Sequence, residues 1–396
     1  MPEHPAPAAG RFLRIGIVCP YSLTVPGGVQ MQVLGLAREL RRRGHEARVL
    51  GPCDGPPPTS FVTPLGNSLP TSANGSVAPL APDPPAVIRT IRVLDEEQFD
   101  VIHVHEPLAP GPTITATLTH RHPTVGTFHA AGVSAMYRVF RPFLSRIIHR
   151  LDRKVVVSKD ALALVQSYLG GEYEVLFNGV DVEQIQRSPV FERPPGDRPA
   201  VFFCGRHETR KGLAVLVEAF SGLDVDAELW IASTGPDTAA LMERTSGDER
   251  FRWLGRISDE EKYSRLRSAD VFCAPSLGGE SFGVVLIEAM AAGTTVVASS
   301  LDGYQNVASH ELDALLSPPG DAAALRASLE RALGDPDLAA RLRAAGRERA
   351  DSFAMSRLAD RYLEIYRELI EARRQRPAPD RFGRRHHTVA RRSPVQ

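Results

Sequence analysis

Two glutamates flanked by glycines are the residues in the second half of the chain best suited to bind a ligand. The stretch PSLGGESFGVVLIEAMAAGTTVVAS places Gly278 and Gly279 directly before Glu280, and Glu288 follows about two helical turns later. Two carboxylates at this spacing can meet one elongated polyhydroxyl ligand from its two ends. Ordinary acidic helix residues would explain the charges but not the flanking glycines. This stretch is therefore predicted to bind a ligand.

Three positive charges are predicted to lie where a strand ends. The segment FCGRHETRKGLAVLVEAF carries Arg206, Arg210 and Lys211 in a turn that leads from an apolar run into a helix. Fixed positive charge suits a diphosphate, because it also stabilises the negative charge that develops on a departing phosphate. Surface Arg and Lys are commonly just solvated, so their location in the fold decides between the two interpretations.

A glycine pair near the N-terminus is a third candidate. In CPYSLTVPGGVQMQVLGLAREL, Gly27 and Gly28 precede a helix that is expected to run to about Arg43. Glycines let backbone amides approach a phosphate closely, and a helix N-terminus favours negative charge. The full GxGxxG spacing is absent, and a tight turn without a ligand would need the same glycines.

The elements that must hold these residues alternate as expected for parallel sheets with helices on both faces. Short apolar runs form one series at 14–19, 100–105, 124–129, 154–158 and 173–177, and a second at 200–205, 227–232, 251–255, 270–275, 294–299 and 313–317. Amphipathic segments of helical length lie between most of them. The predicted fold is α/β, with two doubly wound, Rossmann-like domains whose strands end on either side of a cleft.

A segment rich in Pro and charge, 188–199, is predicted to be the linker between the domains. The expected organisation is a disordered extension (1–13), an N-terminal domain (14–187), the linker, a C-terminal domain (200–355), a helix packing back toward the linker (356–373) and a basic disordered tail (374–396). The Pro-rich stretch 51–86 is expected to be surface loop.

Composition excludes several classes of protein. The chain has 396 residues, 43% of them hydrophobic, with 47 basic and 47 acidic side chains, which rules out a disordered, collagenous or disulfide-stapled polypeptide. The four cysteines are isolated and indicate neither disulfides nor a zinc site. Every stretch long enough to span a bilayer contains Arg, Glu, Asp or Pro, and residues 1–13 do not resemble a signal peptide. A cytoplasmic protein without a nucleic-acid partner is expected.

A metal site is not predicted. Asp224-Val225-Asp226 has a DxD spacing that could offer two carboxylates to a metal ion, but it precedes the apolar run 227–232. It would therefore lie at the amino end of a sheet, away from the cleft.

The motifs together resemble a known family. GGESFGVVLIEAMAAG resembles the E-x7-E motif of retaining family-four glycosyltransferases with the GT-B fold, and GRHETRKG resembles their diphosphate-binding segment. CPYSLTVPGGVQ, HVHEP (103–107), TFHA (127–130) and FNGVD (177–181) resemble, in this order, the phosphatidylinositol mannosyltransferases of that family. The resemblance spans roughly residues 13–372.

The resemblance assigns roles to individual residues. It implies donor contacts by Gly28, Arg206, Lys211, Glu280, Ser281, Phe282, Gly283 and Glu288, and catalytic roles for His129, Arg206, Lys211 and Glu280. Gly28 would lie against the diphosphate, Glu280 would bind sugar hydroxyls, and Glu288 would bind the ribose. His129 would face the reacting centre, although by itself it reads as a strand-end histidine bonded to backbone. Front-face attack, in which a donor phosphate oxygen helps to deprotonate the acceptor, would need no side-chain base and no cofactor.

The resemblance also implies a site for the acceptor headgroup, formed by Tyr21, Gln30, Asn74, Ser76 and Arg210. Two departures remove positive charge from it: Pro79 stands where the family tends to carry Arg, and Ser134 where a Lys is expected. A different headgroup would explain both losses.

Contact with a membrane surface is a separate question. In residues 135–154, the apolar residues Met136, Phe140, Phe143, Ile147 and Leu151 recur at helical spacing among six basic residues. A helix lying on anionic lipid and a core-packed helix with a solvated basic face both fit this pattern. The tail is a second basic candidate, since residues 373–396 hold eight Arg and one Asp.

The resemblance implies transfer of a hexose, mannose from GDP-mannose, to a phosphatidylinositol-type lipid at the inner face of the plasma membrane. Three alternatives stay open: a glycosyltransferase with another nucleotide-sugar and a soluble acceptor, a nucleotide-sugar epimerase, and a non-catalytic nucleotide-sugar binding protein. The residues do not distinguish mannose from glucose or N-acetylglucosamine, nor guanine from uracil.

Overall fold

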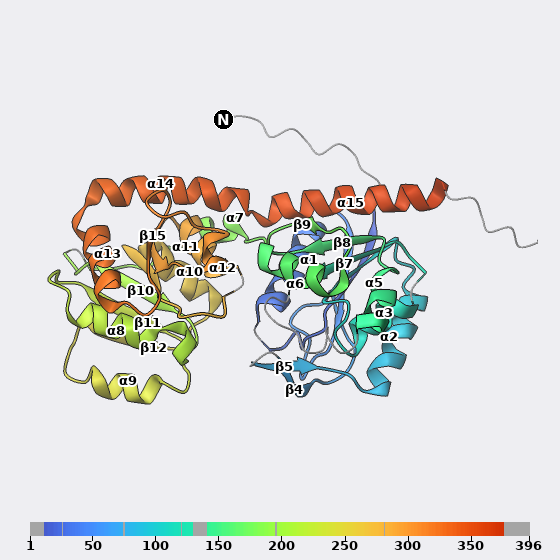
Figure 1. The fold of residues 1–396 in the computed structure, drawn as a ribbon, viewed down its shortest axis with the longest axis horizontal. Helices are drawn as coiled ribbons and strands as arrows, with labels where there is room; N and C mark the ends of the chain where they lie inside the picture. The colour runs from blue at the N-terminus through green and yellow to red at the C-terminus, as the bar shows by residue number, and fades with distance from the viewer. Residues whose placement is uncertain are drawn as a thin grey trace, which may run out of the picture.

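The chain folds into two α/β domains side by side (Figure 1). The computed structural model describes residues 12–25, 27–73, 76–119, 121–129, 141–194, 196–280 and 282–375. The first domain holds a parallel sheet in the order β3-β2-β1-β6-β7-β8-β9. Its strands are β1 (Arg14–Val18), β2 (Glu46–Gly51), β3 (Val62–Pro64), β6 (Val101–His105), β7 (Thr124–Phe128), β8 (Arg153–Val156) and β9 (Glu174–Val175).

The second domain repeats this design with a parallel sheet in the order β12-β11-β10-β13-β14-β15. Its strands are β10 (Ala200–Cys204), β11 (Glu228–Ala232), β12 (Phe251–Gly255), β13 (Val271–Ala274), β14 (Thr295–Ser299) and β15 (Leu315–Ser317). Strands β13 and β14 are buried along their whole length, because helices cover both faces of the sheet.

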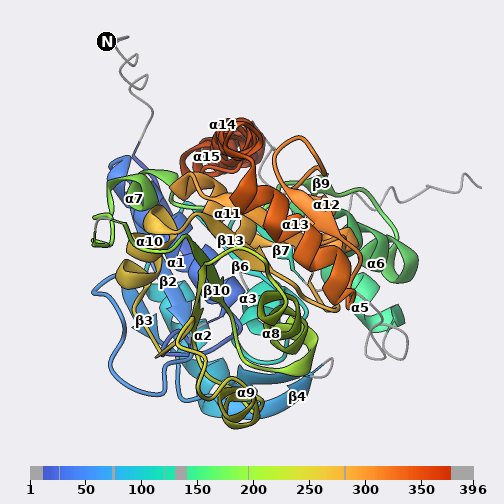
Figure 2. The ribbon, with the colours of Figure 1, turned by 90° about the vertical axis from the view of Figure 1, so that its left-hand side faces the viewer.

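The described helices cover the two sheets (Figure 2). The first domain has α1 (Gly28–Arg42), α2 (Pro84–Glu96), α3 (Pro112–Thr119), α5 (Arg141–Ile148) and α6 (Lys159–Leu169). The rest of the chain forms α7 (Val182–Arg187), the 3-10 turn η1 (Thr209–Lys211), α8 (Leu213–Ser221), α9 (Thr238–Arg244), α10 (Asp259–Ser268), α11 (Val284–Ala292), α12 (Asp302–Gln305), α13 (Ala322–Gly334), α14 (Pro336–Ser352) and α15 (Met355–Gln375). None of them is long and apolar enough to cross a membrane.

The predicted fold class is confirmed, and each apolar run overlaps a strand, but β2 was not among the predicted runs. The interpretation of 51–86 as surface loop is wrong, because this stretch holds β3, the hairpin β4 (Leu69–Ala73) and β5 (Ser76–Leu80), and the start of α2. β3 joins the main sheet through Val62 opposite Val49 of β2. Three residues ending in proline give too short a pattern to be recognised as a strand, although an edge strand tolerates proline.

The chain passes between the domains earlier than the sequence indicated. We expected the boundary at 188–199, but Val180, Val182 and Ile185 are already buried in the core of the second domain. The segment 188–199 lies against that domain, where Phe191 packs edge-on to Trp230 with ring centroids 5.6 Å apart. Proline and charge mark an irregular segment, and here it wraps around a domain instead of joining two.

The C-terminal helix returns to the first domain. We expected a helix over 356–373 packed near 188–199, whereas α15 spans Met355–Gln375 and packs on α1 and the first sheet. Figure 1 shows α14 and α15 almost end to end, each along its own domain. Residues 1–11 and 376–396, which hold most of the predicted disordered ends, lie outside the described residues.

The two crossings between the domains are joined to each other. Val180 donates from its backbone N to the carbonyl of Phe353 at 2.9 Å, and its own carbonyl accepts from Met355 N at 2.8 Å. Gln32 of α1 holds the same place, because its side-chain amide exchanges two hydrogen bonds with the backbone of Gly179, at 2.7 and 2.9 Å. The chain therefore leaves and re-enters the first domain at one point.

We expect the packing of α15 to be a large part of the stability of the first domain. Tyr366 is fully buried and its hydroxyl lies 2.7 Å from His103 Nδ1. Tyr366→Ala should lower the free energy of unfolding by about 3–5 kcal/mol through the cavity that it leaves. Tyr366→Phe, which loses only the hydroxyl, should lower it by about 1–3 kcal/mol.

Urea unfolding measures both values, and the exposed Glu371→Ala on the same helix serves as the control, with a change of at most about 0.5 kcal/mol. Equal stability of Tyr366→Ala and the control would show that α15 does not dock in solution.

Candidate active site

The loop after β10 carries the predicted cations. Arg206 follows the strand, and Arg210 and Lys211 lie in η1, which ends at Gly212. Gly212 has φ +68°, and a Cβ there would collide with the carbonyl oxygen of Pro275 after β13. The close approach of these two loops places the cations against the segment that contains Glu280.

Glu280 meets two of the cations directly. Its Oε1 lies 2.6 Å from Lys211 Nζ and 3.3 Å from Arg210 Nη1, and it accepts a hydrogen bond from Ser276 Oγ at 3.2 Å. Arg210 also pairs with Glu208 at 2.7 Å. The structure thus brings together Arg210, Lys211 and Glu280, the charged residues that the sequence singled out in two separate motifs.

Arg206 differs from the other two cations. Its side chain is 69% exposed, and its contact with Glu208 is 4.0 Å long. The following residue, His207, is buried and anchors the loop through Thr238 Oγ1 at 2.8 Å and the carbonyl of Ala232 at 3.2 Å. A rigid loop therefore presents a cation that is free to meet an anionic ligand.

The N-terminus of α11 lies next to Glu280. The helix begins after Gly283, which has φ +90° and leaves a Cβ no room, since it would lie 2.8 Å from Tyr304 Cδ1. The free amides of a first helical turn favour an anion. Ser281 lies outside the described residues. The side chain of Phe282 packs against Phe177 and Phe353 in the core. The donor contact that we expected of this residue is left to its backbone and stays a prediction.

Glu288 faces a cavity of about 320 Å³ between the domains, lined by residues of α1, the 179–184 crossing, α10, α11 and Met355. The carboxylate is buried, 2.9 Å from Lys262 Nζ and 3.5 Å from Tyr263 OH. Burial opposes the charge on Lys262, but Glu288, Tyr263 and Asp259 outweigh it and raise its pKa. Lys262 was not among the predicted site residues, because its only signal is one lysine in the otherwise ordinary helix DEEKYSRL.

His129 lies at the carboxyl edge of the first sheet, just after β7. Its backbone N donates to Glu106 Oε1 at 2.6 Å, and its ring Nε2 lies 2.8 Å from His105 Nδ1. The ring is therefore held by a side chain, not by backbone as the simpler interpretation had it. His105 and Glu106 belong to HVHEP and were not predicted as site residues, although they end a strand next to His129.

The structure describes the side chains of three predicted acceptor residues, Tyr21, Gln30 and Arg210. Gln30 is buried and donates to the carbonyl of Ser22 at 3.3 Å, and Arg210 belongs to the second domain. Burial and the charge of Glu106 raise the pKa of the Tyr21 phenol. Asn74, the side chain of Ser76, and Ser134 lie outside what the structure describes. Pro79 needs no donor in β5, and its carbonyl accepts from Ser22 N at 2.9 Å.

The carboxyl edges of the two sheets face each other. Met31 in the first turn of α1 and Val284 at the start of α11 line the same cavity, and both helices begin at a carboxyl edge. At the N-terminus of α1, Gly28 is exposed, with open space where a side chain would be. The edge of the first sheet thus offers Gly28 and His129, and the edge of the second offers Arg206, Lys211 and Glu280.

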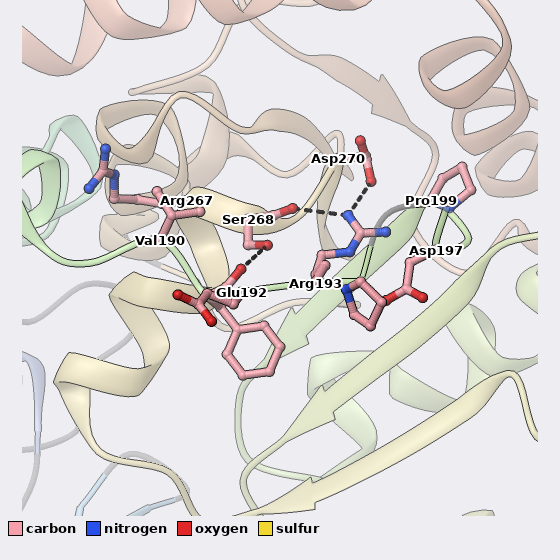
Figure 3. Close-up of a pocket in the computed structure, with 11 residues that line it drawn as sticks. Val190, Glu192, Arg193, Asp197, Pro199, Arg267, Ser268 and Asp270 are labelled. Carbon is pink, nitrogen blue, oxygen red and sulfur yellow. Dashed lines mark hydrogen bonds and ion pairs between the residues drawn. The ribbon is translucent and has the colours of Figure 1, made fainter.

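A second cavity lies at the opposite edge of the second sheet (Figure 3). It encloses about 500 Å³ between the segment 190–199 and the residues that precede β13. In this cavity, Arg193 donates hydrogen bonds to Asp270 at 3.0 Å and to the carbonyl of Ser268 at 3.2 Å. Asp226 of the DxD sequence lies at this amino edge too, paired with Arg198 at 2.9 Å. The motif residues do not line this cavity.

The described part of 135–154 buries one apolar face in the core. Ile147 and Leu151 are buried together with Leu144 and Ile148. Phe143 is 53% exposed. Met136 and Phe140 lie outside the described residues. In α5, the apolar face therefore covers the sheet, as in the core-packed interpretation.

The buried histidines should make stability depend on pH. Burial lowers the pKa of His103 and His129 to about 3 and that of His105 well below its ordinary value. The unfolded chain therefore binds more protons below about pH 6.5, and stability that is fully present above this pH is lost as the pH falls toward the folded pKa values.

Each of these imidazoles should contribute a slope of up to about 1.4 kcal/mol per pH unit. Urea midpoints measured between pH 7 and pH 5 should fall, and the fall should be shallower in His103→Asn. A midpoint that does not change with pH in the unmodified protein would contradict the buried state of the cluster.

Family models and relatives agree with this geometry. The model described as Glycosyltransferase Family 4 matches residues 26–184, and the one described as Glycosyl transferases group 1 matches residues 184–349. Among solved structures, a glycosyltransferase from Rickettsia africae has a TM-score of 0.72 at 18% identity, over 91% of this chain and all of that one. Anabaena HepE, in complex with UDP and glucose, has a TM-score of 0.69 at 18% identity, over 90% of this chain and all of that one. These likenesses show the GT-B fold.

Closer relatives are found among curated proteins. The phosphatidyl-myo-inositol mannosyltransferase of Mycobacterium leprae is 39% identical over 366 residues, which are 89% of this chain and 96% of that protein. The one of Mycolicibacterium smegmatis is 39% identical over 368 residues, 89% of this chain and 93% of its own length. Since the similarity runs through both domains, the chain belongs to the phosphatidyl-myo-inositol mannosyltransferase family of GT-B glycosyltransferases.

Proposed function

We propose that this protein transfers mannose from GDP-mannose to a phosphatidylinositol-type lipid with retention of the anomeric configuration. One observation carries the proposal: Lys211 and Arg210 pair with Glu280 beside the N-terminus of α11. The carboxyl edge of the first sheet, which carries His129, faces this site. The names of the relatives support the choice of mannose and of the lipid.

The cations and the helix N-terminus serve the departing diphosphate. Arg206 and Lys211 neutralise the charge that grows as the bond between the sugar carbon and the phosphate oxygen breaks. In the free protein, Glu280 balances Lys211 at 2.6 Å. When the donor binds, Lys211 reaches a phosphate oxygen and Glu280 turns to the sugar hydroxyls, so no cation is left without a partner.

The acceptor proton goes to the leaving group. The acceptor hydroxyl attacks from the face that the diphosphate leaves, and its proton moves to a phosphate oxygen. His129 does not compete for this proton, because burial lowers its pKa to about 3. Glu106 accepts the backbone N–H of His129 and thereby holds this residue in place.

The nucleotide ribose is assigned to Glu288. In the described part of the chain, Lys262 and Tyr263 both contact Oε1 of Glu288. Oε2 therefore accepts from ribose hydroxyls in this proposal. The cavity beside Glu288 receives the nucleoside, with side chains from both domains around it.

A second candidate function is transfer to a soluble acceptor. Pro79 in β5 favours it, because the position contributes no charge where a lipid phosphate would be bound. Lipid transfer would take place at the inner face of the plasma membrane, with the exposed Phe143 and the basic residues around α5 as the contact surface.

Two substitutions test the donor site. Lys211→Ala should lower kcat by about 100- to 1,000-fold, since it removes a cation that acts on the developing charge. Glu280→Gln should lower kcat by at least about 100-fold while GDP still binds, because the carboxylate meets the sugar and not the nucleotide.

Steady-state transfer rates and calorimetric GDP titrations measure these effects. Arg244→Ala and Glu243→Gln, two exposed changes on α9, are matched controls that should leave both unchanged. Loss of GDP binding together with transfer in Glu280→Gln would argue against a sugar contact.

Labelled donors and acceptors test the substrates. With radiolabelled GDP-mannose and phosphatidylinositol vesicles, label should enter the organic phase, whereas UDP-glucose and UDP-N-acetylglucosamine should give little. Label that appears only in a water-soluble product would support the second candidate, and hydrolysis or epimerisation without an acceptor would reject both.

A further inference from the structure

Three histidines form a row on one face of the first sheet. His103 and His105 are two residues apart on β6, so their side chains point to the same face. His129 follows the neighbouring strand β7. Ring centroids are 4.3 Å apart between His103 and His105 and 5.1 Å apart between His105 and His129. The row leads from the interior, under α15, to the carboxyl edge.

The middle ring, His105, has a polar atom without a partner. Its Nδ1 lies 2.8 Å from His129 Nε2, while its Nε2 is buried with no hydrogen bond to any residue that the structure describes. His103, by contrast, has a hydroxyl at each nitrogen, from Tyr366 and Thr127, both at 2.7 Å. Hydroxyls can donate or accept, so both tautomers of His103 are satisfied, and His103 does not determine which nitrogen of His105 or His129 carries the proton.

The hydrogen bond between His105 and His129 holds one proton. Burial keeps both imidazoles neutral, and a neutral imidazole carries a single N–H. One assignment puts the shared proton on His129 Nε2, and the N–H of His105 is then at its unpartnered Nε2. The other puts it on His105 Nδ1, and the N–H of His129 is then at Nδ1.

The two assignments differ in what is left buried. The first leaves an N–H donor without an acceptor, and the second leaves only a nitrogen lone pair without a donor. Buried donors without acceptors are the rarer of the two in folded proteins. The second assignment is therefore favoured, with a bare Nε2 on His129.

We propose that His105 is a positioning residue that keeps His129 in the tautomer with its proton on Nδ1, so that His129 meets the bound sugar as a neutral hydrogen-bond donor. Glu106 completes the hold by accepting the backbone N–H of His129 at 2.6 Å. The sugar as the partner of Nδ1 rests on the proposed function, whereas the tautomer is a property of the free protein.

Nitrogen NMR of the free protein tests the tautomer without any substrate. In protein labelled with ¹⁵N-histidine, long-range ¹H–¹⁵N spectra distinguish a protonated ring nitrogen from a bare one. The signals absent from His129→Asn identify His129, which should show a protonated Nδ1 and a bare Nε2. A protonated Nε2 on His129 would overturn the proposal.

Two substitutions of His105 test the positioning role. In His105→Asn, the amide nitrogen takes roughly the place of Nδ1 and can still donate to His129, so kcat should stay within about tenfold of the unmodified protein. His105→Phe keeps the ring shape without a donor and should lower kcat about 100-fold, with the KM for GDP-mannose changed by less than about threefold. His122→Asn, at the amino end of β7, is the control and should change neither.

The outcomes separate the two proposals. Equal losses in His105→Asn and His105→Phe would overturn the positioning role, because a merely structural residue gives no rescue by a donor. If His105→Phe does not fold, as judged by its melting temperature, the spectrum of the unmodified protein still shows whether His129 has the tautomer that the proposal requires. If no nucleotide-sugar is turned over, the proposed function fails while the spectrum tests the tautomer alone.

Discussion

The arrangement of the whole molecule depends on one place where the chain crosses twice between the domains. Val180 on the outward crossing exchanges backbone hydrogen bonds with Phe353 and Met355 on the return. Because Gln32 of α1 binds Gly179 at the same point, the first domain is attached to both crossings. Each sheet keeps its own core on either side. The attachment therefore sets how the carboxyl edges face each other, and a ligand between them must be held by side chains from both.

Charge balance explains how the second domain can keep three cations at one strand end. Like charges repel, yet Glu208 and Glu280 lie among Arg206, Arg210 and Lys211. The same carboxylate that neutralises Lys211 in the free protein is suited to sugar hydroxyls once a diphosphate takes over the cation. Binding of an anionic donor would thus exchange one set of partners for another, so that no charge is left unpaired.

In the first domain, by contrast, the buried histidines are neutral. His103 lies beneath α15, His105 and His129 continue the row toward the carboxyl edge, and burial lowers the pKa values of all three. Tyr362 and Tyr366 of α15 provide hydroxyls to Thr127 and His103 at 3.0 and 2.7 Å. A helix that follows the second domain in sequence therefore completes the polar interior of the first. This connection makes the position of His129 dependent on the C-terminal helix.

The sequence alone determined the fold class, the strands of both sheets apart from β2 and β3, and the charged motifs, because these depend on local periodicity and on residue types at short spacing. It also determined the family, through motifs spread over both halves. Only the tertiary structure decided that Lys262 pairs with Glu288, that Phe282 is a core residue, and that the chain crosses between the domains before residue 188. The physical reason is common to all three. Whether a residue packs in the core, forms an ion pair or binds a ligand depends on neighbours that are distant in the chain. The local sequence around the residue does not identify these neighbours.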